Sequence, residues 1–218
     1  MKSFKFGETA NGLPIIADKY GSKGPEVLIL GGVHGDEWEG VVAAKSLQSR
    51  FIDSFTYKLQ LTLVPIFNFD GVLKRQRKNA RQVDLNRNLP TNDWTSDVKE
   101  ERYFPGPEAC SEPENKALVS WLDINKPKLI ISLHSWKPLL NINGRCREEA
   151  DVIAKLTGYE VKESIGYPTP GCLGTYCGIE RDMPTLTYEI EREMPPDEII
   201  KVHVPAILEA LKVTEDRH

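Results

Sequence analysis

Four short apolar runs, separated by segments with helical spacing, constrain the fold of this chain most strongly. Residues 27–32 (VLILGG), 59–67 (LQLTLVPIF), 128–133 (KLIISL) and 185–190 (TLTYEI) each predict a strand buried in a sheet. The intervening and closing segments predict helices over residues 38–51, from 111 to about 122, over 148–156 and over 197–211. This alternation predicts an α/β fold with a mixed, mostly parallel central sheet and helices on both faces.

Two local signals refine these boundaries. Pro65 has no amide hydrogen to give to a neighbouring strand, so we expect it near the end of the second strand. Ser111 is predicted to be the N-cap of the following helix, and Glu114 lies three residues on, as in a capping box. Because ligand sites of such folds lie beyond the carboxyl ends of the strands, functional residues are expected there.

Length and charge exclude several classes of protein. The 218 residues suit one domain, 1–218, and the net charge of −4 disfavours a general nucleic-acid binder. No run of about 18 apolar residues predicts a membrane span, and residues 1–7 lack the apolar core of a secretory signal. We therefore expect a cytoplasmic protein with no membrane or nucleic-acid partner. The sequence leaves the oligomeric state open, a homodimer included.

The four cysteines are Cys110, Cys146, Cys172 and Cys177, and none forms a CxxC pair, which disfavours a zinc ribbon. Free thiols are the expectation for a reducing compartment. A bridge between Cys172 and Cys177 is left open by their proximity in sequence, since spacing alone does not establish disulfide geometry.

The first predicted strand ends in a possible pair of metal ligands, His34 and Glu37, in the sequence HGDE. Imidazole and carboxylate both bind zinc, and two ligands three residues apart in a turn can reach one ion. The alternative is a plain strand-to-helix turn, with Glu37 stabilising the dipole of the next helix. His134, at the end of the third strand, would complete a His₂Glu set, although a histidine there could also bond to backbone.

A basic stretch lies between these residues. Residues 74–87 hold six basic side chains and one acidic one, and so carry a net charge of +5. No aromatic residue interrupts the stretch to stack on bases, which disfavours nucleic-acid binding. A solvated loop and recognition of a substrate carboxylate by a planar guanidinium remain as interpretations.

The ordered set of these motifs resembles the zinc carboxypeptidase family. After HxxE come residues 68–71 (NFDG), Arg77 and residues 83–88 (VDLNRN), followed by His134 and Glu189. Residues 164–171 (SIGYPTPG) and 174–177 (GTYC) are similar to a narrower branch, the murein peptide amidases. The segments 93–94, 105–106 and 111–114 share this similarity.

The resemblance implies a fold and a set of roles. It implies a zinc carboxypeptidase-like fold with one Zn²⁺ held by His34, Glu37 and His134. Arg77 would polarise the scissile carbonyl, and Asn86 with Arg87 would bind the free carboxylate of the substrate. Glu189 would be the general base, although Glu191 points to the same side of the strand and is its competitor.

Several positions depart from the family pattern. Gln82 replaces a glycine before the VDLNRN run, which is unfavourable if the backbone there has a positive φ. Leu89 replaces an aromatic residue, Phe69 replaces a proline, and Cys172 stands where serine is common. Tyr167 and Tyr176 could touch the substrate, but tyrosines beside glycine and proline more often pack in loops, so neither is included in the catalytic set.

The leading hypothesis is a zinc-dependent amidase. The resemblance implies hydrolysis of the γ-D-glutamyl–meso-diaminopimelate bond of murein tripeptide in cell-wall peptide recycling. The alternatives are a C-terminal carboxypeptidase or an N-acyl amino acid deacylase, since each of their substrates presents a carboxylate. A catalytically silent binding protein and a nucleic-acid binder using residues 74–87 are the rivals from other classes.

Overall fold

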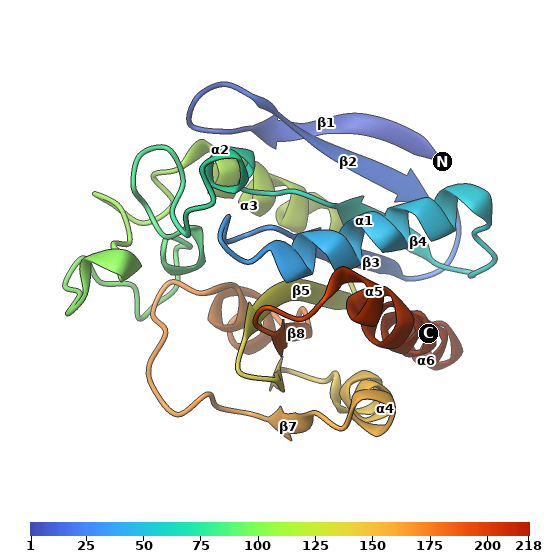
Figure 1. The fold of residues 1–218 in the computed structure, drawn as a ribbon. Helices are drawn as coiled ribbons and strands as arrows, with labels where there is room; N and C mark the ends of the chain where they lie inside the picture. The colour runs from blue at the N-terminus through green and yellow to red at the C-terminus, as the bar shows by residue number, and fades with distance from the viewer.

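The computed structural model describes residues 1–218 and has one eight-stranded sheet at its centre (Figure 1). The strands are β1 (Lys2–Glu8), β2 (Pro14–Tyr20), β3 (Glu26–Gly31), β4 (Gln60–Val64), β5 (Leu129–Trp136), β6 (Leu139–Asn143), β7 (Glu160–Lys162) and β8 (Thr185–Glu191). They lie in the order β1-β2-β4-β3-β5-β8-β6-β7. The four central strands are mutually parallel, and antiparallel pairings attach the outer ones. The mixed, mostly parallel sheet is confirmed.

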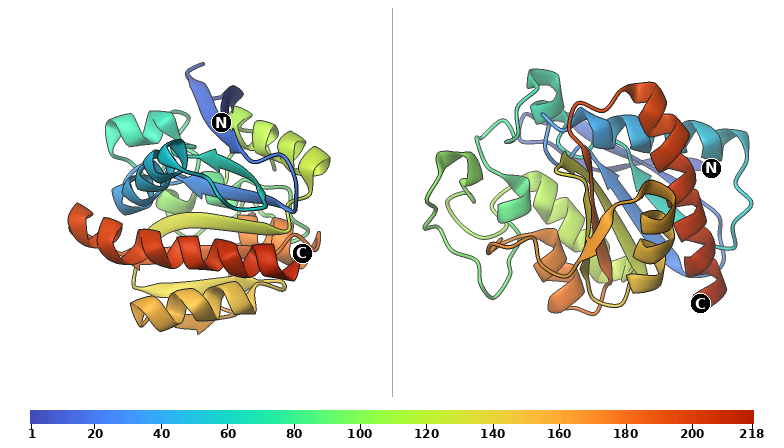
Figure 2. Two further views of the ribbon diagram at one scale, coloured as in Figure 1. Left: turned by 90° about the vertical axis from the view of Figure 1, so that its right-hand side faces the viewer. Right: turned by 60° about the horizontal axis from the view of Figure 1, so that its bottom comes forward.

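Helices cover both faces of the sheet. They are α1 (Trp38–Asp53), α2 (Phe69–Lys74), α3 (Pro113–Asn125), α4 (Arg147–Thr157), α5 (Pro196–Glu198) and α6 (Val204–Arg217). Between α5 and α6 the chain makes a wider helical turn, Ile199–His203, and another forms at Gly174–Ile179. The views in Figure 2 show α6 and α4 side by side, in agreement with their packing. None of these helices is long and apolar enough to cross a membrane.

The alternation of side chains along the central strands divides the core into two layers. Val27 and Ile29 of β3 pack with residues of α1, α4 and α6 in the larger cluster. Leu28 and Leu30 point to the opposite face and pack with Leu118 of α3 and with the loops. Because both faces of β3 are buried, its sequence is a continuous apolar run.

The predicted strands and helices are all present, and four strands had no prediction. β1 and β2 form an antiparallel hairpin at one edge, and β6 and β7 form the opposite edge. β4 ends at Val64, directly before Pro65, as expected. The closing helix extends beyond the predicted range, to Arg217.

The predicted capping box at residues 111–114 is wrong. The N-cap of α3 is Glu112, with no side-chain capping bond, and Pro113 is the first helical residue. The Ser111 hydroxyl donates instead to Oε1 of Glu112 (2.8 Å). The carboxylate of Glu114 accepts from the Ala10 amide (2.9 Å) in the β1–β2 hairpin. Glu114 therefore links distant segments instead of capping its own helix.

Gln82 stands where the family pattern has a glycine, and its backbone is in the unfavourable conformation that this replacement predicts. Its φ is +61°, in the left-handed region that favours glycine. Its amide donates to the carbonyl of Asn79 (3.1 Å), which closes the turn before residues 83–88. All four cysteines are free, so Cys172 and Cys177 do not pair.

Candidate active site

The carboxyl ends of β3, β5 and β8 meet at one edge of the sheet and open into a cavity of about 590 Å³. Cavities of this size commonly bind small molecules. All but one of the predicted site residues line it: His34, Glu37, Arg77, Asn86, Arg87 and Glu189. The remaining one, His134, is buried and contacts the lining residue Glu37. The fold thus brings all seven predicted site residues together.

His34, Glu37 and His134 form a compact group of potential metal ligands. Nδ1 of His34 lies 2.8 Å from Oε1 of Glu37, and Nδ1 of His134 lies 2.9 Å from Oε2. The two Nδ1 atoms are 3.2 Å apart. All three residues are buried. Glu37 is the N-cap residue of α1, next to the helix dipole as the alternative expected, but its carboxylate contacts the two imidazoles and makes no capping bond.

This geometry fits zinc. A tetrahedral ion with bonds of about 2.0–2.1 Å needs ligand atoms about 3.3 Å apart, close to the distances between these three side chains. The other imidazole nitrogens are also held: Nε2 of His34 lies 3.1 Å from Oδ1 of Asp84, and Nε2 of His134 lies 2.9 Å from Oγ of Ser132. Such outer partners fix the ring orientation of metal-binding histidines.

Local packing positions the His34 turn. Gly35 abuts α2 so closely that a Cβ atom there would lie 2.0 Å from the carbonyl carbon of Gly71. Asn68 caps α2 by accepting from the Gly71 amide (2.9 Å), and its own amide group donates to the carbonyls of Val33 and Arg77. The NFDG turn therefore holds the His34 loop and the Arg77 segment together.

Asp84 connects the metal ligands with Arg77. It is fully buried, and its Oδ2 accepts from Nε of Arg77 (2.8 Å) while its Oδ1 faces His34. Burial opposes ionisation, but the charges of Arg77 and His34 hold the pKa of Asp84 well below its usual range. Sequence reasoning gave Asp84 no role, although it lies inside the 83–88 motif.

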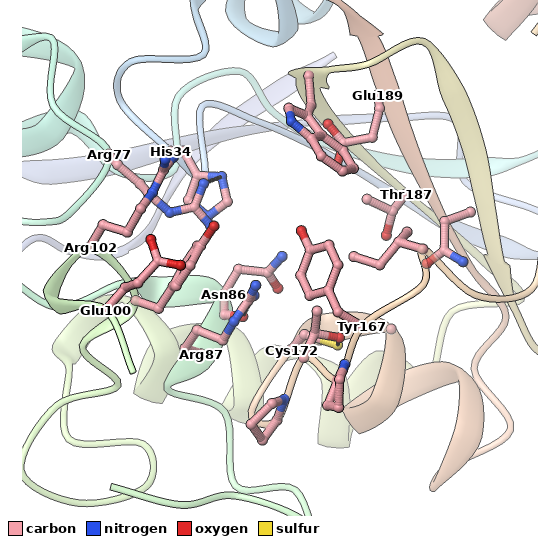
Figure 3. Close-up of a pocket in the computed structure, with 18 of the residues that line it drawn as sticks. His34, Arg77, Asn86, Arg87, Glu100, Arg102, Tyr167, Cys172, Thr187 and Glu189 are labelled. Carbon is pink, nitrogen blue, oxygen red and sulfur yellow. Dashed lines mark hydrogen bonds between the residues drawn. The ribbon is translucent and has the colours of Figure 1, made fainter. Parts of the chain in front are cut away.

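Asn86 and Arg87 lie across the cavity from Glu189 (Figure 3). Oδ1 of Asn86 accepts from the amide of Leu173 (2.9 Å), which leaves its NH₂ group free to donate into the cavity. The Arg87 guanidinium donates to the carbonyl of Asn86 (2.7 Å) and lies over the ring of Tyr103, 5.2 Å from its centre. Together they present several N–H donors, as a bound carboxylate requires.

Glu189 lies next to the metal ligands because β8 pairs in register with β5, opposite His134. One of its carboxylate oxygens is buried with no hydrogen-bond partner. Burial raises the pKa of Glu189 to about 7. Glu191, the competing candidate, is exposed and does not line the cavity.

Two further features of the cavity had no prediction. Arg102 and Tyr103, from the short helical turn Glu101–Tyr103, line one side, and the amide side chains of Asn141 and Asn143 line another. Tyr167 lies in the cavity beside Trp136, where contact with substrate is open to it, whereas Tyr176 is buried in the core. No local sequence pattern marks Arg102, Tyr103, Asn141 or Asn143, whereas Tyr167 is part of the quoted 164–171 segment.

Comparison with known proteins identifies the family. The family described as zinc carboxypeptidase matches residues 1–167. The chain belongs to the zinc carboxypeptidase family. It is therefore a zinc hydrolase that acts on peptide or amide bonds.

Several individual proteins are similar to this chain in sequence or in fold. The chain is 31% identical to murein peptide amidase A of Vibrio campbellii, over 87% of this chain and 78% of that protein. It is similar to the crystal structure of murein-tripeptide amidase MpaA from Escherichia coli O157, with a TM-score of 0.80, 25% identity, and coverage of 97% of this chain and 92% of that one. Bovine thrombin-activatable fibrinolysis inhibitor, 20% identical with a TM-score of 0.82 over 100% of this chain and 91% of that one, shares the fold.

Proposed function

We propose that this zinc carboxypeptidase hydrolyses the γ-D-glutamyl–meso-diaminopimelate amide of murein tripeptide, L-Ala-γ-D-Glu-meso-diaminopimelate. Water adds across the scissile amide, so that the C–N bond breaks and L-alanyl-D-glutamate and free diaminopimelate are released. The observation that carries the proposal is the convergence, in one cavity, of the His34–Glu37–His134 group, a free Glu189 oxygen and a carboxylate-binding pair. The similarity to murein peptide amidase A supports the choice of substrate.

Each residue has a distinct role in this mechanism. Zinc, when bound by His34, Glu37 and His134, supplies Lewis acidity that favours deprotonation of water and polarises a carbonyl. Glu189, whose carboxylate has a buried oxygen with no partner in the protein, accepts the proton of the attacking water and passes it to the leaving amine. Arg77 donates to the carbonyl oxygen as it becomes negative, an interaction worth roughly 3–4 kcal/mol in comparable sites.

Substrate binding is assigned to two parts of the cavity. Asn86 and Arg87 bind the carboxylate of diaminopimelate next to the scissile bond. Asn143 and Thr187 make no side-chain hydrogen bond within the protein, and Asn141 uses only its NH₂ group, to the carbonyl of Lys162 (3.0 Å). These neutral donors and acceptors suit the distal end of diaminopimelate, where an ammonium and a carboxylate cancel in charge.

We place the reaction in the cytoplasm, as a step in recycling of cell-wall peptides. The four free thiols are consistent with a reducing compartment. Within the chain itself, residues 1–218 are proposed to act as one catalytic domain.

Product analysis by mass spectrometry tests the proposal. The chain is incubated with murein tripeptide, an ordinary tripeptide and N-acetyl amino acids, with and without chelator. We expect diaminopimelate from murein tripeptide only, loss of release with chelator, and recovery when zinc is restored. His134→Ala is the matched variant and is expected to lose both zinc and turnover.

Three other outcomes would contradict the proposal. Turnover of the ordinary tripeptide alone would indicate a C-terminal carboxypeptidase, and turnover of acetyl amino acids alone would indicate a deacylase. Binding of substrate without release from any of them would indicate a silent binding protein.

A further inference from the structure

The ring of Tyr103 is surrounded by three guanidinium groups. The Cζ atoms of Arg77, Arg87 and Arg102 lie 5.3, 5.2 and 5.1 Å from its centre. These distances are within the range of cation–π contacts. Three like charges around one ring repel one another, so this arrangement favours anionic ligands in the adjoining cavity.

Arg102 differs from the other two in having no partner for its charge. Arg77 pairs with Asp84 and Glu37, and Arg87 donates to a backbone carbonyl. Arg102 makes no ion pair or hydrogen bond in the structure and is held only by the contact of its guanidinium with Tyr103. It is exposed yet lines the active-site cavity. Its N–H donors are therefore available to a ligand in the cavity.

The position of Arg102 indicates which part of the substrate it would reach. Figure 3 shows Arg102 on the same side of the cavity as His34 and Arg77, whereas Tyr167, Cys172 and Thr187 lie on the opposite side. In the proposed reaction Arg77 faces the scissile carbonyl, and Asn86 with Arg87 binds the leaving-group carboxylate. In this view Arg102 lies nearer to Arg77 than to Arg87, which favours a place on the side of the acyl group.

We infer that Arg102 binds a second carboxylate of the substrate, carried by the acyl residue next to the scissile amide. This inference rests on the proposed function and extends it. A γ-linked glutamyl residue keeps its α-carboxylate free, only a few bonds from the scissile carbonyl. Arg102 therefore selects γ-glutamyl amides with a free α-carboxylate over those whose α-carboxylate is amidated. Tyr103 is the positioning residue that holds this guanidinium toward the cavity.

A pair of substrates and two variants test the inference. The substrates are murein tripeptide and its D-isoglutamine analogue, in which the α-carboxylate is a carboxamide. The variants are Arg102→Gln and, as a matched control for lost charge, Arg145→Gln. Arg145 is exposed, pairs with Asp182 (3.0 Å) and lies outside the cavity. Because both arginines are exposed, neither substitution removes core packing.

We expect the wild-type kcat/KM to be at least about 10-fold higher for the free acid than for the amide, as is typical for a charge-assisted hydrogen bond. Arg102→Gln should abolish this preference by raising KM for the acid, with the amide unaffected. Arg145→Gln should leave both values unchanged. Calorimetric binding of the acyl product, L-alanyl-D-glutamate, against L-alanyl-D-isoglutamine gives the same comparison without turnover.

The outcomes separate the inference from the proposed function. Cleavage of both substrates at equal rates, or equal losses on both with Arg102→Gln, would overturn the role of Arg102 and leave the amidase function intact. The chain could instead fail to cleave the tripeptide yet bind L-alanyl-D-glutamate more tightly than L-alanyl-D-isoglutamine, through Arg102. This result would overturn the amidase function and leave the role of Arg102 intact. Absence of both cleavage and binding preference would overturn both.

Discussion

Replacing Asp84 with asparagine tests whether a residue outside the ligand set controls the metal site. Asparagine has the same shape as aspartate but lacks the negative charge, and its NH₂ group cannot accept the hydrogen bond from Arg77. In the native site one oxygen of Asp84 faces His34 at 3.1 Å and the other accepts from Nε of Arg77 at 2.8 Å. The substitution thus disturbs the orientation of a zinc ligand and the pairing of the Arg77 guanidinium, whose side chain is only 14% exposed.

The expected magnitude follows from these two contacts. A buried hydrogen bond to a charged group contributes about 1.5–3 kcal/mol, which corresponds to a loss of about 10- to 100-fold in zinc affinity. Breaking the buried pair with Arg77 should in addition lower the free energy of unfolding by about 3 kcal/mol. Because Arg77 would lose its alignment, kcat should fall even at saturating zinc.

Three measurements check this expectation. Competition with a chromogenic chelator gives zinc affinity, thermal unfolding of the metal-free chain gives stability, and kinetics at saturating zinc give kcat. Asp182→Asn is the control, because Asp182 forms an exposed pair with Arg145 that contributes at most about 1 kcal/mol. Wild-type zinc affinity in Asp84→Asn would refute the argument that Asp84 orients His34.

Three further predictions concern single residues. Glu189→Gln should lower kcat by about 10²- to 10⁴-fold while zinc content is retained, and Glu191→Gln, on the same strand, should be nearly silent; a larger effect at Glu191 would reverse the assignment of the base. Arg87→Ala should raise KM far more for substrates with a free carboxylate on the leaving group than for their amides, as steady-state kinetics on both will show; equal effects would remove Arg87 from this role. Burial lowers the pKa of His203 to about 4. Between pH 6.5 and 4 this histidine is therefore protonated in the unfolded chain but neutral in the folded one. The free energy of unfolding should therefore fall by about 3 kcal/mol between pH 6.5 and 4 and then level off. Denaturant titrations at each pH should show this loss of unfolding free energy in the wild type but not in His203→Asn. Curves of unfolding free energy against pH that run parallel in the two proteins would contradict the prediction.

Local patterns were sufficient for the central part of the fold. Strands β3, β4, β5 and β8 have continuous apolar or alternating sequences, because they are buried between layers of helices. Two of the outer strands lack this signal: β6 reads LLNIN, with two asparagines that line the cavity, and β7 has only three residues. Their existence follows from pairing with β8 and with each other, which is a long-range effect.

The sequence by itself determined the chemical groups of the site: ordered motifs predicted the seven residues that the fold brings together at one cavity. Only the tertiary structure placed Glu191 outside the cavity, linked Asp84 to both His34 and Arg77, and brought Arg102 to the cavity. The physical reason is distance along the chain. Motif spacing reports side chains within a few residues of each other, whereas charge pairing and access to a cavity depend on segments that meet only after the sheet has assembled.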